Sequence, residues 1–170
     1  MTTREIIDGL LAREGGEYSD DPVDRGGPTK WGVTMPALAE FWGRSVTAAQ
    51  VAALTREEAA EVYEHQYLNR SGFLHLLDER VRVLALDWAV NSGIGTATKA
   101  LQRLVGVEAD GVCGPVTLAA ANARDGRALV KQLGLARQHF YVSIVRRDPE
   151  QIRFLDGWLN RNWAVTVEPL

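Results

Sequence analysis

The chain has 170 residues, of which 46% are hydrophobic and 24% are charged. These values are close to the averages for soluble globular proteins, so they exclude a fibrous or largely disordered chain, and the length suits one ordinary domain. The formal net charge of −3 argues against a nucleic-acid-binding protein, because neutralising phosphates requires a strong basic surplus. We therefore expect a compact protein without a nucleic-acid partner.

The charge is unevenly distributed along the chain. Residues 1–123 hold 11 Lys and Arg against 17 Asp and Glu, whereas residues 124–170 hold 8 against 5. A mildly basic C-terminal part can approach a polyanion, although a solvated helix face explains these basic residues equally well.

Cysteine content and hydropathy limit the cellular context. Cys113 is the only cysteine, so the chain has no internal disulfide and no multi-cysteine metal site, and we expect this thiol to pack as a small apolar group. The N-terminus carries Arg4, Glu5 and Asp8 without a long apolar run, and no stretch reaches the ~18 residues of a membrane span. We expect synthesis in the cytoplasm without a signal peptide.

The first predicted element is a helix over residues 3–14. Thr2 and Glu5 have the spacing of a capping box, and the apolar residues that follow share one helical face: Ile6, Ile7, Leu10 and Leu11. Gly15 and Gly16 are typical helix terminators. Glu14 is therefore the last residue of this helix or the first beyond it.

Residues 17–34 are rich in turn signals, with Asp-Pro at 21–22 and Gly-Gly-Pro at 26–28, and they predict at most a short, irregular hairpin. Helices are expected to resume at 35–43, 47–54 and 56–68. Thr55 and Glu58 form a second potential capping box at the start of the last of these.

The segment 78–92 predicts the central buried helix, because five apolar residues share one face: Val81, Leu84, Ala85, Trp88 and Ala89. Further helices are expected at 96–106, from Pro115, at 126–147 and at 150–164. The glycine-rich region 93–95 is the candidate subdomain seam. The predicted class is mainly α with a small N-terminal β-hairpin or loop element.

Several common chemistries lack their motifs. His65, His75 and His139 do not form an HExxH spacing, no GxSxG elbow is present, and GIGTATK at 93–99 lacks the second half of a P-loop or dinucleotide motif. Asp110-Gly111 resembles the middle of an EF-hand loop, but Gly106 and Thr117 would occupy two principal ligand positions. An Asp-Gly turn is the better interpretation.

The carboxylates of residues 14–34 fit acid/base chemistry. Glycosidic hydrolysis needs a carboxylic acid that donates a proton to the leaving oxygen, and a second polar group that stabilises charge or positions water. A glutamate at the end of an apolar helix can be partly desolvated, which favours its protonated form, while aspartates in a hydrated loop stay ionised. The alternative is a solvent-exposed helix end followed by an acidic loop.

The same stretch resembles the signature of glycoside hydrolase family 108, the muramidases of secretion-activator and phage-endolysin type. The pattern is EGG, a few residues, then DPxDxGGxTxxG(I/V)T, which the chain matches at Glu14, Gly15, Gly16, Asp21, Pro22, Asp24, Gly26, Gly27, Thr29, Gly32, Val33 and Thr34. Weaker matches follow in AVNSG, around Asp110-Gly111 and in FLDGWLNR. The resemblance implies a lysozyme-like helical bundle, with a catalytic region at 1–92 and a helical peptidoglycan-domain region at 93–170 packed into the same body.

The resemblance also implies roles for three residues. Glu14 is the general acid that cleaves the β-1,4 bond between N-acetylmuramic acid and N-acetylglucosamine, Asp24 stabilises charge or orders water, and Thr29 helps to hold that water. The chain departs from the pattern at Glu17, which stands before Tyr18 where the aromatic residue usually follows the glycines directly. Glu17 is thus a rival acid, although we expect it to be too exposed.

Four further residues are candidates for substrate binding. Tyr18 and Trp31 can stack on sugar rings or cover the edge of the core. Asp87 and Asn91 lie four residues apart on one helical face, where they can line a cleft floor or form structural hydrogen bonds. Trp158 and Trp163 are expected to pack internally.

The leading prediction is a monomeric peptidoglycan hydrolase, a muramidase or endolysin that needs no metal or other cofactor. A wall-binding module without catalysis is the alternative, and a calcium-ordered loop of Asp20, Asp21 and Asp24 is a third possibility. The expected partners are peptidoglycan glycan strands and a holin or export channel, which would bring the enzyme to the wall in the periplasm. Both prophage bacteriolysis and a secretion-accessory role fit the sequence.

Overall fold

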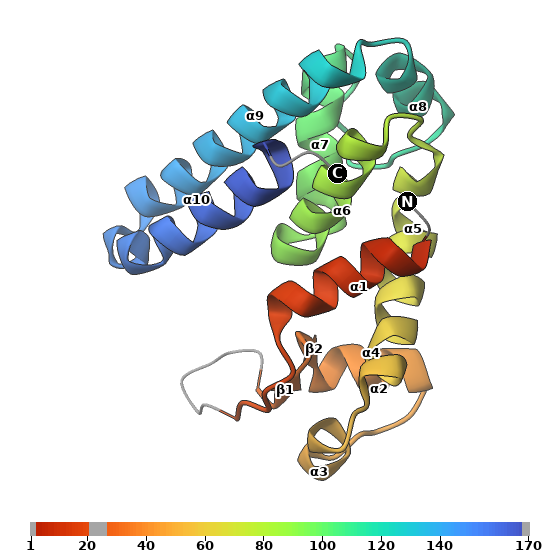
Figure 1. Cartoon of the computed structure of the whole chain (residues 1–170), viewed down its shortest axis with the longest axis vertical. Helices are drawn as coiled ribbons and strands as arrows, with labels where there is room; N and C mark the ends of the chain where they lie inside the picture. The colour runs from red at the N-terminus through yellow and green to blue at the C-terminus, as the bar shows by residue number, and fades with distance from the viewer. Residues whose placement is uncertain (1–2, 21–26, 168–170) are drawn as a thin grey trace. The chain divides into compact units, whose positions relative to one another are not determined.

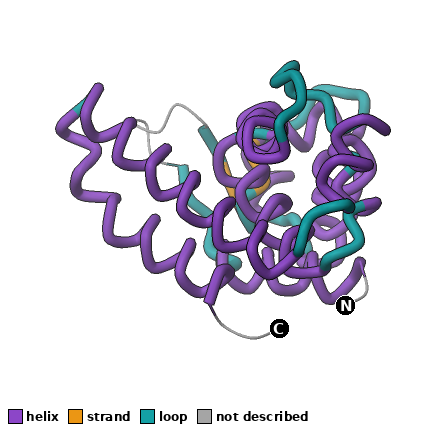
Figure 2. The backbone as a smooth tube through the Cα atoms, turned by 90° about the horizontal axis from the view of Figure 1, so that it is seen from above, coloured by secondary structure: helices purple, strands orange, loops and turns teal. Residues whose placement is uncertain are grey.

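The computed structural model describes residues 3–20 and 27–167. Most of this chain is helical, and strand structure is confined to one short antiparallel pair (Figures 1 and 2). The predicted mainly α, lysozyme-like class with a small N-terminal hairpin is confirmed. None of the described helices has both the length and the apolar character needed to cross a membrane.

The chain forms two compact units, residues 1–70 and residues 71–170. The candidate seam at 93–95 joins two helices within the second unit. The predicted boundary between a catalytic region (1–92) and a peptidoglycan-domain region (93–170) is a statement about function. It stays a prediction.

The first unit contains the hairpin and the helices around it. In chain order its elements are α1 (Thr3–Glu14), β1 (Thr29–Lys30), β2 (Val33–Thr34), α2 (Met35–Trp42), α3 (Ala48–Ala52), α4 (Arg56–Tyr63), the π-helix η1 (Glu64–Leu68) and α5 (Asn69–Ser71), which ends at the boundary. The helices expected at 3–14, 35–43 and 47–54 are present within two residues of their predicted ends.

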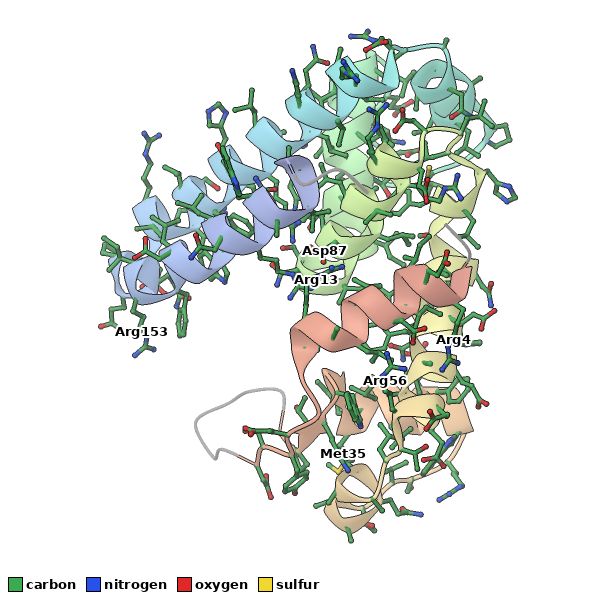
Figure 3. All side chains as sticks on the ribbon, in the orientation of Figure 1. Arg4, Arg13, Met35, Arg56, Asp87 and Arg153 are labelled. Atoms are coloured by element: carbon green, nitrogen blue, oxygen red, sulfur yellow. The ribbon has the colours of Figure 1, made fainter. Side chains whose placement is uncertain are left out.

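The packing of α1 against α4 forms much of the core of the first unit. The apolar face predicted for α1 is confirmed, since all four of its residues are almost fully buried: Ile6, Ile7, Leu10 and Leu11. On the other side of α1, Asp8 pairs with Arg56 of α4 at 2.7 Å and with Arg4 at 3.4 Å (Figure 3). Thr2, the expected cap of α1, lies outside the described residues.

The capping box of α4 is confirmed. Thr55 Oγ1 accepts a hydrogen bond from the Glu58 backbone N–H at 3.2 Å, and Glu58 Oε2 accepts one from the Thr55 backbone N–H at 2.8 Å. Thr47 and Gln50 form an equivalent box at the start of α3, which the sequence analysis did not identify. These local bonds satisfy backbone donors that a helix start leaves without partners.

The helix predicted at 56–68 changes character after Tyr63. Residues 64–68 form a π-helical turn, in which the Asn69 N–H reaches the carbonyl of Glu64. Tertiary contacts hold this segment: Gln66 Nε2 donates to the carbonyl of Ala37 at 2.9 Å, and the ring of His65 lies 5.3 Å from that of Phe41. Such widened turns insert an extra residue and redirect the side chains that follow.

In its described part, the second unit contains helices joined by loops and no strands. Its elements are the 3₁₀-helix η2 (Phe73–His75), α6 (Glu79–Ser92), α7 (Ile94–Val105), α8 (Pro115–Asn122), α9 (Gly126–Arg147), the 3₁₀-helix η3 (Pro149–Gln151) and α10 (Ile152–Val167). Helix α6 contacts α7, α9 and α10, and residues 81 and 83–89 are all buried. The prediction of a central buried helix is confirmed.

A charged cluster lies in the interior of the second unit. Asp87 of α6 and Arg137 of α9 are both fully buried and pair at 2.8 Å, and Arg161 of α10 reaches the same carboxylate at 3.1 Å. Arg137 Nε donates to Tyr141 Oη at 2.7 Å, and this hydroxyl donates to Asn91 Oδ1 at 3.1 Å. The network connects three helices through charge-assisted bonds.

The loop before α8 is a turn, as predicted. Asp110 Oδ1 accepts hydrogen bonds from the Val112 backbone N–H and from Gln102 Nε2, and both bonds lower the pKa of the Asp110 carboxyl. Gly111, with φ of 88°, completes the turn. Cys113 is half-buried, and this burial raises the pKa of its thiol to about 11, in agreement with the expected inert packing role.

The two C-terminal tryptophans differ. Trp158 packs as predicted, with its ring 5.2 Å from that of Tyr141 and 6.0 Å from that of Phe154. The packing prediction for Trp163 is wrong, because this side chain is 61% exposed. Helical spacing identified an apolar residue on α10 but did not show how wide a face of this helix is covered.

Candidate active site

Glu14 is the last residue of α1 and is half-buried. The helix ends here because Gly15 takes a left-handed conformation with φ of 73°, while its N–H still donates to the carbonyl of Leu11 at 3.1 Å. The buried face of α1 therefore fixes the position of Glu14, and the two glycines direct the chain away from it.

The hairpin turns at Trp31 and Gly32. Thr29 pairs with Thr34 and Lys30 with Val33, and both turn residues have positive φ, 53° for Trp31 and 71° for Gly32. Positive φ at both central residues is the geometry of a type I′ turn, which matches the twist of the strands. A tryptophan in this conformation is unusual, so surrounding contacts must hold it.

Two neighbours hold Trp31. Its ring lies directly over Gly16, where a β-carbon would come within 2.6 Å of Cη2 and 2.7 Å of Cζ2. Its carbonyl accepts a hydrogen bond from Tyr63 Oη at 3.1 Å. The second glycine of EGG is therefore required by the ring of Trp31, rather than by the end of the helix alone.

Gly32 brings the turn against Glu14. A β-carbon at Gly32 would overlap Tyr63 Oη and would lie 3.0 Å from Glu14 Cγ and 3.1 Å from Glu14 Oε2. The absence of a side chain thus allows the backbone of the turn to approach the carboxyl group. Helix end, hairpin turn and α4 meet at this point.

Tyr67, in the π-helical turn, is a further polar group near Glu14 that the sequence analysis missed. Its ring lies 5.5 Å from that of Tyr63. Burial raises the pKa of Tyr67, and the negative charge of Glu14 raises it further, so the phenol stays protonated near neutral pH. The four-residue spacing of Tyr63 and Tyr67 was a visible signal of a shared helical face, but it did not indicate that this face meets Glu14.

The other motif residues lie in the same hairpin region. Thr29 Oγ1 donates to the carbonyl of Gly27 at 2.9 Å, and Lys30 Nζ donates to the carbonyl of Ala52 at 2.7 Å. Tyr18 is 39% exposed and its hydroxyl donates to Asp20 at 3.2 Å. Glu17 is exposed, which confirms that expectation for the rival acid.

Asp24 lies outside the described residues, as do Asp21 and the other residues of 21–26, so its predicted role stays a prediction. The proposed calcium-ordered loop depends on the same segment. Among the residues that the structure describes, no three His, Cys, Asp or Glu side chains gather closely enough to share a metal ion.

Asp87 and Asn91 belong to the second unit. The carboxylate of Asp87 is fully buried between Arg137 and Arg161, and the amide oxygen of Asn91 accepts a hydrogen bond from Tyr141. These contacts fit the second interpretation given for both residues, which is that they form structural hydrogen bonds. Their predicted role in substrate binding remains a prediction.

The half-buried carboxyl at the helix end, beside a tight hairpin in a mainly α protein, matches the site expected of a lysozyme-like glycoside hydrolase. The family model described as Glycosyl hydrolase 108 matches residues 7–93, and the model described as Predicted Peptidoglycan domain matches residues 96–163. The chain belongs to the glycosyl hydrolase 108 family.

A solved structure supports the same assignment. The chain is similar to the structure of Brucella abortus SagA, with 31% sequence identity, a TM-score of 0.76, and coverage of 98% of this chain and 96% of that chain. No curated protein matches the sequence. The family model boundary falls between residues 93 and 96, whereas the compact units meet between Arg70 and Ser71. The glycosidase match therefore includes α6, the central helix of the second unit.

Proposed function

We propose that this protein is an N-acetylmuramidase that cleaves the β-1,4 bond between N-acetylmuramic acid and N-acetylglucosamine in peptidoglycan, with Glu14 as the general acid. The observation that carries the proposal is the half-buried Glu14 carboxyl, held against the backbone of Gly32 beside Tyr67. Membership of a glycosidase family and the predicted peptidoglycan domain support the same substrate class.

In this mechanism the glycosidic oxygen receives a proton from Glu14 as the bond to the anomeric carbon breaks. Partial burial at the end of α1 removes water from one side of the carboxyl group, while the glycine backbone leaves room for a sugar ring to approach. The nearby backbone of Gly32 limits the directions in which the carboxyl can point, and the orientation of the proton donor contributes to the rate in addition to its acidity.

Thr29 and Asp24 complete the proposal. The hydroxyl proton of Thr29 is donated to the Gly27 carbonyl, so its oxygen can meet a water molecule only as an acceptor. That arrangement turns a lone pair of the water outward, as nucleophilic attack requires. Asp24 would stabilise the positive charge of the transition state or take the proton of this water.

The test is hydrolysis of purified peptidoglycan, with the muropeptides analysed by mass spectrometry. We expect wild type to release fragments with reducing-end N-acetylmuramic acid, and Glu14→Gln to be slower by about 10²–10⁴-fold, the usual contribution of a general acid. The matched control is Glu17→Gln, three residues away and exposed, which should keep wild-type activity. Equal rates for wild type and Glu14→Gln would refute the mechanism, and a different reducing end would refute the bond assignment.

A non-catalytic wall-binding protein is the second candidate, because the predicted peptidoglycan domain spans 96–163. Retention on insoluble peptidoglycan without any new reducing ends would favour it. We further propose that the protein acts on the wall in the periplasm as a monomer, after passage through a holin or a dedicated channel. Cell lysis that depends on a co-expressed holin would support this route.

A further inference from the structure

Two adjoining cavities lie between α7 and α9 in the second unit. Their volumes are about 330 Å³ and 410 Å³, and they share four lining residues: Arg103, Leu104, Ala136 and His139. Because they share these walls, they form one continuous depression along the two helices, which contact each other (Figure 1). We call it the α7–α9 groove.

The walls of the groove follow the helical period. On α7 the lining residues are Thr96, Ala100, Arg103 and Leu104, and on α9 they are Gln132, Leu135, Ala136, His139 and Phe140. Residues three and four apart lie on one face of a helix, so each helix presents one stripe to the groove. Small side chains at Ala100 and Ala136 leave the space between the stripes open.

The groove is cationic. Arg103 and His139 lie within it and Arg124 stands at one end, and all three side chains are exposed. None of the described residues that line either cavity is an aspartate or a glutamate. Neither arginine side chain forms an ion pair or hydrogen bond with another described residue, so both guanidinium groups are available to an anion.

The floor of the groove adds an apolar surface and a further donor. Trp88 of α6 lines one cavity and is 1% exposed, with its ring 5.8 Å from that of Phe140. Its Nε1–H is buried without a hydrogen-bond acceptor among the described residues. Buried donors normally have partners, and among the described residues this indole N–H, on a side chain that lines the cavity, has none.

We propose that the α7–α9 groove binds the stem peptide of peptidoglycan through its carboxylates. This inference rests on the proposed function, because it takes peptidoglycan as the substrate. A stem peptide carries free carboxylates next to alanine methyl groups, and the groove sets guanidinium groups next to Leu104, Leu135 and alanine walls. The glycan strand itself lacks this combination of closely spaced anions and methyl groups.

Binding at the groove would hold the strand on the second unit while the first unit cleaves it. It gives a physical use to Arg103 and Arg124, which the proposed chemistry at Glu14 does not need. Loss of the groove should therefore weaken retention on the wall much more than it slows cleavage of a soluble glycan without peptides.

The experiment measures retention of the Glu14→Gln protein on purified sacculi, so that the substrate stays intact. The groove variant adds Arg103→Glu and Arg124→Glu, and the matched control adds Arg127→Glu and Arg146→Glu, two exposed arginines outside the groove lining. Both variants change the net charge equally. We expect the groove variant to bind at least tenfold more weakly and the control to bind within about twofold of the parent, with circular dichroism confirming that both are folded.

A second arm identifies the ligand. An amidase cuts the amide bond between the glycan and the stem peptide, and it dissolves the sacculi into peptide-free glycan strands. The free stem peptides should therefore compete with intact sacculi for the parent protein at least tenfold more effectively than these strands. Competition by the peptide-free strands as strong as that by the free peptides, or equal loss in both variants, would overturn the proposal. In the wild-type background, hydrolysis of a peptide-free glycan tests the Glu14 chemistry alone, so failure of either proposal is distinguishable from failure of the other.

Discussion

The two units use their unusual residues for different purposes. In the first unit, Gly16 makes room for the ring of Trp31, Gly32 lets the hairpin backbone approach Glu14, and Trp31 is held at positive φ. In the second, the unusual feature is the carboxylate of Asp87, buried between two arginines at the centre of a helical bundle. In the first unit, a strained backbone position lies beside the candidate catalytic carboxyl. In the second unit, the buried charges connect neighbouring helices. Substitutions in the two units should therefore have separable effects on activity and stability.

The largest effect on stability is expected from Asp87→Asn. Removing the carboxylate leaves Arg137 buried without its counter-charge, and loss of one partner of a buried pair costs about 3–5 kcal/mol. Urea unfolding followed by circular dichroism would measure it. The control Asp156→Asn, at an exposed position of α10, should change the free energy of unfolding by less than about 0.5 kcal/mol. If Asp87→Asn lowered the free energy of unfolding as little as Asp156→Asn, the charged cluster around Asp87 would not stabilise the fold.

The next effect concerns Gly32→Ala. A left-handed conformation costs a non-glycine residue about 1–2 kcal/mol, and the new methyl group would also overlap Tyr63 and press on Glu14. We expect a loss of about 2 kcal/mol in stability and at least a tenfold lower rate of peptidoglycan hydrolysis.

Gly43→Ala is the matched control for Gly32→Ala. Gly43 has a similar φ of 63° at the end of α2, but a β-carbon there would meet no atom within 4 Å. This variant should share the backbone strain and keep its activity. If both variants lost activity equally, the close contact at Gly32 would have no special role.

A smaller effect is expected from Tyr67→Phe. The raised pKa keeps this phenol protonated as a hydrogen-bond donor beside the charge of Glu14, so its removal should lower the hydrolysis rate by about three- to tenfold with little change in unfolding. Rates measured between pH 4 and 9 should show a displaced alkaline limb, because a general acid stops donating once it has lost its proton. Glu64→Gln, an exposed change in the same π-helical turn, should leave rate and pH profile unchanged. An unaltered profile for Tyr67→Phe would remove Tyr67 from the site.

The smallest effect is expected from Asp78→Asn, which removes the charge of Asp78 but keeps its role as the cap of α6. Asp78 caps α6, and its hydrogen bond with Arg80 lowers the pKa of the carboxyl below 3.8. A depressed pKa stabilises the fold above the unfolded value and loses this contribution as pH falls through the folded value. Because asparagine caps equally well, Asp78→Asn should cost less than about 1 kcal/mol at pH 7, and this cost should shrink as the pH falls through the folded pKa, as followed by melting temperature. If the loss of stability were the same at every pH, it would come from the cap rather than from the charge.

Local patterns in the sequence predicted much of the fold. The apolar face of α1, the capping box at Thr55 and the buried face of α6 are all present, because helix propensity, capping and 3.6-residue periodicity act within a few residues of the chain. The signature around Glu14 likewise identified the family and the candidate acid. The exposure of Glu17 followed from its position beyond the helix terminator.

The tertiary structure decided what these patterns could not express. The π-helical turn that directs Tyr67 toward Glu14 is stabilised by contacts with α2, more than twenty residues earlier in the chain. Asp87 meets arginines fifty and seventy-four residues away, and Trp163 is exposed although its spacing suggested packing.

The sequence by itself determined the helices, their caps and the motif that carries Glu14, since each depends on neighbours along the chain. The partners of Glu14, Asp87 and Trp31 were decided only by the fold, because contacts between distant segments depend on how whole helices pack. The glycines of the motif illustrate both points. The sequence shows that they are glycines, but only the structure shows that Gly16 makes room for the ring of Trp31 and Gly32 for the carboxyl of Glu14.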